Sequence, residues 1–355
     1  MGKRIFGLWG KTINVLAVVA TLFGLATSLG LGVQQVSAGM AHLFKLSDTT
    51  TTQVILIIVI TLMATGSVVA GLSSGVRRLS QLNMVLAVFF LLFMLFVGPT
   101  VFIMNSYIQN TGGYIQDFFG LSSWTETYMQ SDWQSDWTVF YWAWWVSWSP
   151  FVGMFIARIS RGRTLKEFVL GVLIVPSLIT FLWLSAFGGS AMFLEINELA
   201  DIANAVTNNI ATSLYVLLEH FPLSTITSFV NIVLVISFFV TSSDSGSLVV
   251  DSLTAGGKLD APVAQRIFWA IAEGAVAAVL LIGGGLGALQ TASISTGLPF
   301  AFLLIIMIWS LLKGLKEEHS GLVETQIEAE RKQYLDTLAK MLQRREQIKT
   351  RSEKK

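Results

Sequence analysis

The chain has 355 residues, of which 53% are hydrophobic and only 13% are charged, and it contains no cysteine. Soluble domains usually carry about 25% charged residues, so the composition excludes a protein with a fully solvated surface. The net charge of +1 gives no support to a nucleic-acid partner, and the lack of cysteine excludes disulfides and thiolate metal sites.

Eight stretches are long and apolar enough to cross a bilayer as helices, which takes roughly 20 residues each. In chain order they cover 12–33, 53–73, 82–104, 137–158, 166–188, 225–247, 266–285 and 296–313. A series of this kind is not typical of core helices in a soluble protein. The sequence therefore predicts an all-α, polytopic helix bundle in the cell membrane, with the lipid bilayer as its surroundings.

The basic residues predict the orientation of the bundle, because Lys and Arg favour the cytoplasmic side of a membrane. If residue 1 is cytoplasmic, all of the 23 Lys and Arg residues except Lys45 fall in or beside inner segments. The long outer loops 105–136 and 189–224 contain Asp and Glu but neither Lys nor Arg. Both termini are therefore expected in the cytoplasm.

Three segments outside the spans are expected to be helical. Residues 113–128 and 192–218 are read as short helices over the outer end of the bundle. From Lys313 the composition becomes highly charged, with apolar residues at helical spacing, which predicts a membrane domain over 1–313 and a cytoplasmic helical tail over 314–355. The tail is either a solvated helix end or a regulatory arm attracted to anionic lipid.

The strongest local pattern is DWTVFYWAWW over 136–145, followed by VSWSP over 146–150. Interfacial anchoring by Trp explains Trp137, but Trp144 and Trp148 lie deeper and share one helix face, with Trp145 beside them. Indole faces turned inward can hold a trimethylammonium group by cation–π contacts worth about 2 kcal/mol when desolvated. An aromatic packing stripe is the alternative that the residues alone leave open.

The stretch 136–145 resembles the signature of the betaine/choline/carnitine transporter family, and segments 24–39, 147–164 and 238–251 resemble it as well. The resemblance implies a secondary active transporter that takes up a quaternary-ammonium solute: glycine betaine, choline or carnitine. It implies Trp144, Trp145 and Trp148 as substrate-binding residues, with Phe140 as a further candidate.

The resemblance also implies a leucine-transporter-like fold of two inverted five-helix repeats, with its sites near the midplane, assembled as a homotrimer. On that pattern the chain would hold the last three helices of the first repeat and all five of the second. Two family-specific N-terminal helices and the first two core helices would be absent.

A second polar group, TSSDS over 241–245, lies in the sixth predicted span. Hydroxyls in membrane helices commonly bond to their own helix carbonyls. The family resemblance instead implies a partial sodium site made of Thr241, Ser242 and the carbonyl of Phe238, with Na⁺ as the coupling ion, although proton coupling stays open. Asp244 is expected to face a cytoplasmic vestibule.

Three other positions stand out within the predicted spans. Glu273 is an ionisable residue inside the seventh span, and no role is assigned to it beyond reaching toward the cytoplasmic side. Pro150 removes a backbone hydrogen bond to Val146 and is expected to kink the fourth span. The glycine run 283–285 permits a hinge.

Enzymatic function is not expected, since the sequence has no HExxH, phosphate-binding-loop or GxSxG motif. Apart from Na⁺, no cofactor is expected. Two alternatives to an active transporter remain: a truncated, transport-incompetent membrane fragment or subunit, and an osmotic sensor whose tail responds to the state of the membrane.

Overall fold

The computed structural model describes residues 7–70, 75–129, 131–257 and 262–352. Residues 1–6, the end of the second predicted span (71–73) and the last tail residues (353–355) lie outside this range. The described residues form helices and no strand, which confirms the predicted all-α class. Contacts divide the chain into one unit of Phe6–Phe300 and another of Ala301–Lys355 with Met1–Ile5.

Within the described residues, six helical segments are long and apolar enough to cross a membrane. They are Leu8–Phe44, Thr50–Val69, Arg78–Val97, Leu165–Ile196, Ser224–Thr254 and Val263–Gly321. The chain is thus a multi-pass membrane helix bundle, as predicted. The last segment contains two of the predicted spans, and the Trp-rich span 137–158 is helical without being among the six, so the count of eight stays a prediction.

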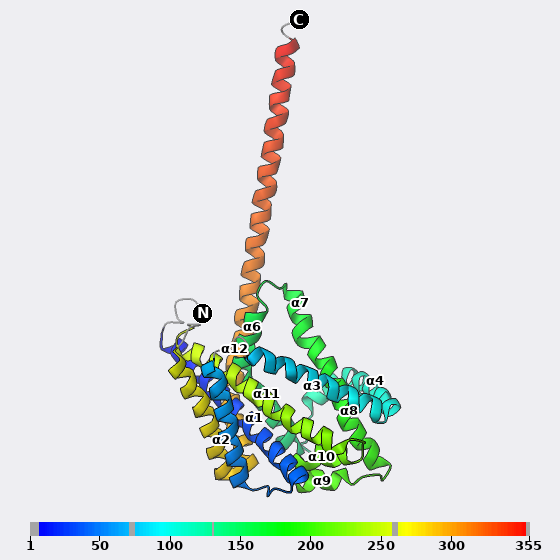
Figure 1. Cartoon of the computed structure of the whole chain (residues 1–355). Helices are drawn as coiled ribbons and strands as arrows, with labels where there is room; N and C mark the ends of the chain where they lie inside the picture. The colour runs from blue at the N-terminus through cyan, green and yellow to red at the C-terminus, as the bar shows by residue number, and fades with distance from the viewer. Residues whose placement is uncertain (1–6, 71–74, 130, 258–261, 353–355) are drawn as a thin grey trace. The chain divides into compact units, whose positions relative to one another are not determined.

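The helical elements of the chain, named as in Figure 1, are α1 (Leu8–Phe44), α2 (Thr50–Ala70), α3 (Gly75–Val97), α4 (Thr100–Gln116), α5 (Phe118–Ser123), η2 (Gln134–Val139), α6 (Phe140–Ile159), α7 (Leu165–Val169), η3 (Leu170–Ile174), α8 (Val175–Ile196), α9 (Ile202–Asn208), η4 (Ile210–Thr212), α10 (Ser213–Glu219), α11 (Ser224–Thr254) and α12 (Val263–Ser352).

Helices α1 and α11 pack along each other at the centre of the larger unit, and α2 and α6 each contact both of them (Figure 1). Apolar residues of α1, α2, α11 and α12 form one buried cluster there: Ala26, Leu29, Val33, Ile57, Ile60, Ala64, Val240, Ala277, Leu281 and Leu289. A separate apolar cluster joins α3, α4 and α8. The helix that begins the chain is therefore the core element against which the Trp-rich helix α6 is placed.

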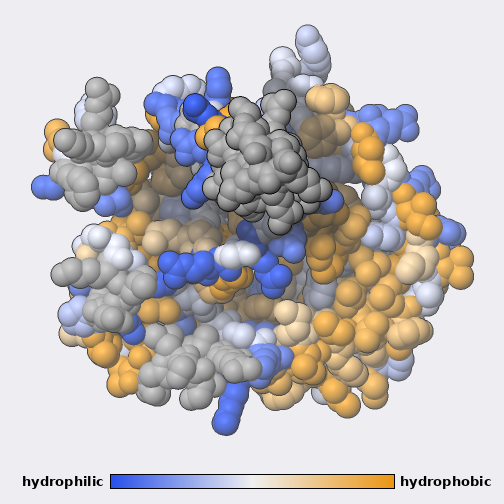
Figure 2. Space-filling view, turned by 90° about the horizontal axis from the view of Figure 1, so that it is seen from above, coloured by the Kyte–Doolittle hydropathy of each residue, from blue (hydrophilic) through white to orange (hydrophobic). Residues whose placement is uncertain are grey.

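Large apolar side chains also cover much of the outer surface of the bundle. Figure 2 shows broad orange areas where hydrophobic residues lie exposed. On α8, for example, Val175 is 52% exposed and Ile179 is 54% exposed. An exposed apolar surface of this extent would be unstable in water and suits contact with lipid.

The predicted span 82–104 is wrong in its extent, because the helix breaks at Gly98–Pro99. Helix α3 ends at Val97 and α4 starts at Thr100. Proline has no N–H to donate and clashes with a preceding helical turn, so the apolar stretch divides into two helices. Helix α4 then packs on α8.

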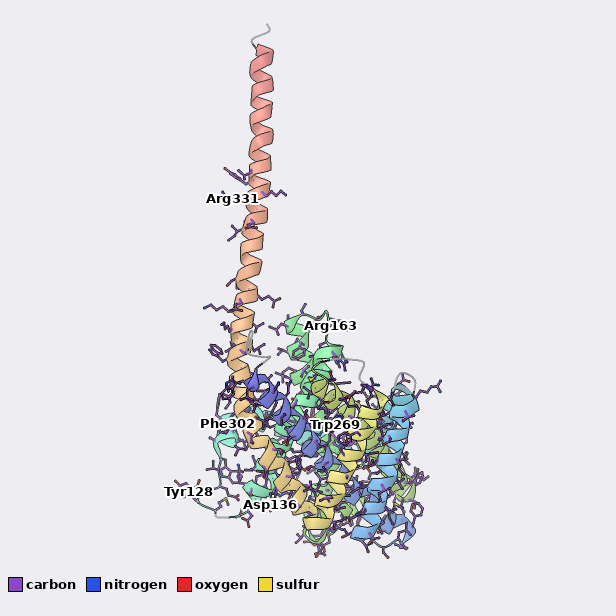
Figure 3. The ribbon with its side chains drawn as sticks, turned by 90° about the vertical axis from the view of Figure 1, so that its left-hand side faces the viewer. Tyr128, Asp136, Arg163, Trp269, Phe302 and Arg331 are labelled. Atoms are coloured by element: carbon purple, nitrogen blue, oxygen red, sulfur yellow. The ribbon has the colours of Figure 1, made fainter. Side chains whose placement is uncertain are left out.

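Short helices are confirmed for 192–218, where α9, η4 and α10 follow the end of α8. In 113–128, α4 ends at Gln116 and only α5 follows. Figure 3 places Tyr128 and Asp136 at one end of the larger unit and Arg163 at the other. The acidic loop before α6 and the basic loop after it thus lie at opposite ends, as expected for a helix that crosses a membrane.

Helix α12 is interrupted within the glycine run. Gly284 has φ −172° and ψ 16°, and Gly285 has φ 59° and ψ −139°. The chain reverses at this point (Figure 3), and helix resumes directly where a loop was expected. The glycine run thus forms a turn between two helical segments, and its role as a hinge stays a prediction. In the smaller unit, helix continues to Ser352, so the tail is helical as predicted. Its apolar residues Tyr334 and Leu335 are exposed.

The turn at Gly285 generates a prediction on stability. Gly285→Ala is expected to lower the free energy of unfolding by roughly 1–3 kcal/mol, because its φ and ψ lie in a region open essentially only to glycine. Gly287→Ala is the matched control, since a Cβ there meets open space. Thermal unfolding of the purified proteins measures the difference, and equal midpoints for the two variants would contradict a strained turn.

Candidate functional site

The Trp-rich motif begins in a π-helical turn, Gln134–Val139, and continues as α6. Such π-helical turns are uncommon and are often found at functional sites. Within this region the ring of Trp137 stacks on Tyr141, with centroids 6.0 Å apart and an interplanar angle of 5°. The aromatic residues of the motif thus form a connected series that leads from the outer end of α6 toward the middle of the bundle.

Trp144 and Trp148 line a cavity of about 350 Å³ between α1, α6, α11 and the short helix η4. Both side chains are half-buried. The cavity is lined by Ser28, Leu31, Gly32, Gln34, Gln35, Tyr141, Trp144, Trp148, Ile210, Ala211, Phe238, Phe239 and Ser242. None of these lining residues is charged, so the cavity combines aromatic faces with neutral polar groups.

Trp144 is fixed by hydrogen bonds to α1. Its indole N–H donates to the carbonyl of Gly24 at 3.2 Å and to the hydroxyl of Ser28 at 3.0 Å. Behind it, Phe140 is only 3% exposed and stacks on the Trp144 ring at 5.7 Å and 10°. Phe140 therefore supports the ring of Trp144 and is not among the residues that line the cavity.

The position of the Trp148 ring depends on the absence of a side chain at Gly24. A Cβ at Gly24 would lie 2.9 Å from Cδ1 of Trp148 and 3.3 Å from the backbone carbon of Ser147. The first distance is shorter than real Cβ contacts and the second is tighter than most of them, so the Trp148 ring or the α6 backbone would have to move. The glycine thus lets α6 lie directly against α1 at the level of the cavity.

Trp145 has a different position from its two neighbours. It is 66% exposed and lines a smaller recess of about 210 Å³ together with Tyr141, Trp144 and Trp148. All four residues of this recess are aromatic and come from one helix. The structure therefore brings Trp144 and Trp148 to both hollows and places Trp145 at the smaller one alone.

A chain of hydroxyl groups holds α6 against α1 and α12. Ser147, between the two tryptophans, donates to the carbonyl of Ser293 at 3.0 Å. Ser293 donates to the hydroxyl of Thr27 at 2.8 Å, and Thr27 donates to the carbonyl of Leu289 at 2.9 Å. These bonds satisfy buried polar groups that have no access to water, and they fix the rotation of α6.

Pro150 lies inside α6 and cannot donate a backbone hydrogen bond. The hydroxyl of Ser149 donates to the carbonyl of Val146 at 2.6 Å, so the acceptor that proline leaves without its usual partner is satisfied by the neighbouring side chain. This compensation explains how a proline is tolerated two residues after Trp148.

The predicted sodium ligands lie together on α11. The Thr241 hydroxyl donates to the carbonyl of Phe238 at 2.9 Å and to that of Ser237 at 3.1 Å, and Ser242 lines the cavity. Asn83 of α3 donates its amide N–H to the Thr241 hydroxyl at 3.2 Å. The carbonyl oxygen of this Asn83 amide is buried without a hydrogen-bond partner among the described residues.

These groups fit a small hard cation, which takes oxygen ligands. The unpaired oxygen of Asn83 supports this, because a buried acceptor without a partner is costly. A half-turn of the amide exchanges its nitrogen and oxygen and would turn the oxygen toward Thr241. The roles of Thr241, Ser242 and Phe238 stay predictions.

Asp244 does not face a vestibule as expected. Its side chain is fully buried, and one carboxylate oxygen accepts a hydrogen bond from Ser67 of α2 at 2.6 Å. The expectation was wrong because the sequence does not show that α2 covers this side of α11.

Three residues that line or support the site were missed by the sequence analysis. Ser28 binds the Trp144 indole, Tyr141 lines both hollows, and Asn83 contacts Thr241. A buried amide in the otherwise apolar stretch of α3 was the one available signal, since polar groups are costly inside a membrane.

The whole of this site lies within a segment that matches a known protein family. Residues 1–320 match the model of the betaine/carnitine/choline family transporters. The chain belongs to this family. Its members are transporters and not enzymes, which agrees with the sequence analysis.

Several relatives are named as glycine betaine transporters. The chain is 51% identical over 318 residues to a glycine betaine/proline/choline transporter of Vibrio parahaemolyticus, covering 89% of this chain and 57% of the relative. It is 44% identical to a glycine betaine transporter of Acinetobacter baylyi, covering 89% of this chain and 48% of that protein. It is also 44% identical to a glycine betaine transporter of Bacillus subtilis, covering 90% of this chain and 62% of that protein. The chain thus spans roughly half to three-fifths of the length of these relatives.

The bond between Trp144 and Ser28 can be tested by a double-mutant cycle. Trp144→Phe and Ser28→Ala each remove one partner, and we expect a coupling of about 1 kcal/mol in the free energy of unfolding. The control cycle pairs Trp145→Phe with Ser28→Ala and should show no coupling, because the Trp145 ring is exposed. Equal coupling in both cycles would contradict the assigned bond.

Proposed function

We propose that this protein is the site-bearing part of a secondary active transporter that takes up a quaternary-ammonium solute, with glycine betaine as the first candidate within the betaine, choline and carnitine class. One observation carries the proposal: Trp144 and Trp148 line an uncharged cavity of about 350 Å³. Its volume falls within the range of roughly 300–1,000 Å³ that is usual for small-molecule sites.

An uncharged aromatic cavity selects for the type of cation. A primary ammonium group needs hydrogen-bond acceptors when it leaves water, whereas a trimethylammonium group has no N–H to satisfy. Indole faces attract its spread charge without a carboxylate, by about 2 kcal/mol or more per desolvated contact. Trp144 and Trp148 would hold this group, with Tyr141 beside them; Trp145 and Phe140 would support the aromatic wall.

The other end of such a solute would meet neutral polar groups. Ser28, Gln34 and Gln35 lie along the α1 side of the cavity and Ser242 along the α11 side. Hydroxyl and amide groups can donate to a carboxylate or pair with a hydroxyl. The names of the relatives, which include both betaine and choline, support a site that accepts either.

Sodium is the proposed coupling ion, bound by Thr241, Ser242 and the carbonyl of Phe238, with the Asn83 oxygen as a fourth ligand. A bound Na⁺ would supply one positive charge next to the cavity. Because α11 carries both these residues and the cavity-lining Phe239, the ion and the solute would stabilise the same arrangement of α11. Binding of each would then favour binding of the other.

Orientation and assembly are part of the same proposal. Both termini lie in the cytoplasm, the tail over 314–355 is cytoplasmic, and the protein assembles as a homotrimer in the cell membrane. The opposite placement of Asp136 and Arg163 at the two ends of the larger unit supports the orientation (Figure 3), since Arg-rich loops stay inside.

Cation–π recognition predicts that the positive charge matters more than the shape of the solute. Glycine betaine should bind the purified protein roughly 30-fold more tightly than tert-butylacetate, its neutral-headed analogue, which corresponds to about 2 kcal/mol. Trp148→Leu should remove most of this preference. Equilibrium dialysis with radiolabelled betaine and competing tert-butylacetate measures this preference.

The matched control for this experiment is Trp133→Leu, which removes an exposed indole that packs on Trp124. It should bind betaine like the unaltered protein. Equal affinity for betaine and its analogue, or equal loss in both variants, would contradict the aromatic site.

The sodium site predicts that one hydroxyl controls the ion dependence of solute binding. Thr241→Val should raise the sodium concentration needed for half-maximal betaine binding by roughly tenfold, or about 1.4 kcal/mol. Thr254→Val is the control on the same helix. The Thr254 hydroxyl donates to the helix carbonyls of Val250 and Asp251 and accepts a hydrogen bond from the Gln265 amide. An unchanged sodium response in Thr241→Val would reject this ligand.

A further inference from the structure

Two polar contacts join α11 to the first part of α12 in an antiparallel arrangement. Near the end of α11, Asp251 pairs with Arg266 at 3.3 Å. Two turns back along α11 and two turns on along α12, Ser243 donates to the carboxyl of Glu273 at 2.9 Å. The first contact is an ion pair between Asp251 and Arg266. In the second, the partner of the Glu273 carboxyl is a neutral hydroxyl.

Glu273 is deeply buried. Its side chain is 4% exposed, and Ala270 and Ala277, one turn away on either side, are 1% and 0% exposed. The adjacent Gly274 lies against Thr61 of α2. Water therefore has little access to this carboxyl.

No described cation is placed to neutralise Glu273. Arg266 is already paired with Asp251 and lies two turns away, roughly 10 Å along the helix. Residues 12–41 of α1 and all of α2 carry no titratable side chain. On α3, Arg78 is exposed. The titratable group nearest to it on α11 is Asp244, which is buried and hydrogen-bonded to Ser67 and directly follows Ser243, the donor to Glu273.

An ionised carboxylate in these surroundings would lack both hydration and a counter-charge, and a second acid nearby would oppose its ionisation further. Taking up a proton removes that cost and leaves a neutral acid that can still accept from Ser243. We propose that Glu273 is a proton-binding site inside the membrane-spanning bundle, which holds its proton at neutral pH. Glu273 does not line the solute cavity and is not one of the candidate sodium ligands.

Protonation of this site makes the packing of α11 on α12 depend on pH. Any arrangement that admits water between α11 and α12 hydrates the carboxylate and releases the proton, so high pH favours separation of these helices. Unfolded glutamate loses its proton near about pH 4.3. Between that pH and the pH at which folded Glu273 ionises, the folded protein binds the extra proton, so stability falls as pH rises.

The test uses the purified chain and does not depend on transport. Infrared spectroscopy at neutral pH should show the C=O stretch of a protonated carboxylic acid, which should disappear at alkaline pH and be absent from Glu273→Gln. The unfolding midpoint of the unaltered protein should fall with rising pH relative to Glu273→Gln. Glu219→Gln, at a 53% exposed carboxyl, should follow the unaltered protein.

The proposal is overturned if the unaltered protein shows no protonated-acid band at neutral pH. It is also overturned if Glu273→Gln keeps the full band and the same dependence of the midpoint on pH. Should Glu273→Gln fail to fold, Glu273→Asp keeps a carboxyl at this position and must shift the band. An unshifted band would assign the proton to another group. Loss of betaine binding with these signals intact would affect only the proposed transport function.

Discussion

The close packing of α6 on α1 is the constraint on which the rest of the site depends. Trp144 donates to Gly24 and Ser28 of α1, and the missing side chain of Gly24 makes room for the ring of Trp148. Both aromatic rings are therefore held by α1 and cannot turn freely toward lipid. The cavity exists because α6 is fixed on one side while α11 closes the other.

Inside a membrane this packing must be achieved without water, and hydroxyl groups meet that requirement. The hydrogen bonds that link Ser147, Ser293 and Thr27 satisfy polar groups across three helices. The Ser149 hydroxyl donates to the carbonyl of Val146, to which Pro150 has no N–H to donate. Neutral hydroxyls and amides satisfy backbone groups without burying charge. Neutral hydroxyl, amide and carbonyl groups also surround Thr241, where we propose a sodium ion. Glu273 is the exception, because a buried carboxyl with one hydroxyl donor needs a proton as well.

Spacing in the sequence predicted the main features of the fold and part of the site. Apolar stretches located the long helices, and the four-residue interval between Trp144 and Trp148 correctly placed both rings on one face. Trp145 and Phe140 could not be separated from them in this way, because the choice depends on which neighbours α6 meets. The break at Gly98–Pro99 was missed since apolar residues continue on both sides of it. The burial of Asp244 was missed for a similar reason: Ser67, its partner, lies far away in the sequence.

The position of a bound solute tests the central claim most directly. Arsenobetaine replaces the nitrogen of glycine betaine with arsenic, whose anomalous scattering locates the trimethylated cation in a crystal of the protein with sodium present. The account predicts one arsenic peak between the rings of Trp144 and Trp148, in the cavity bounded by α1 and α11. A peak at a different place, with this cavity empty at saturating arsenobetaine, would contradict it.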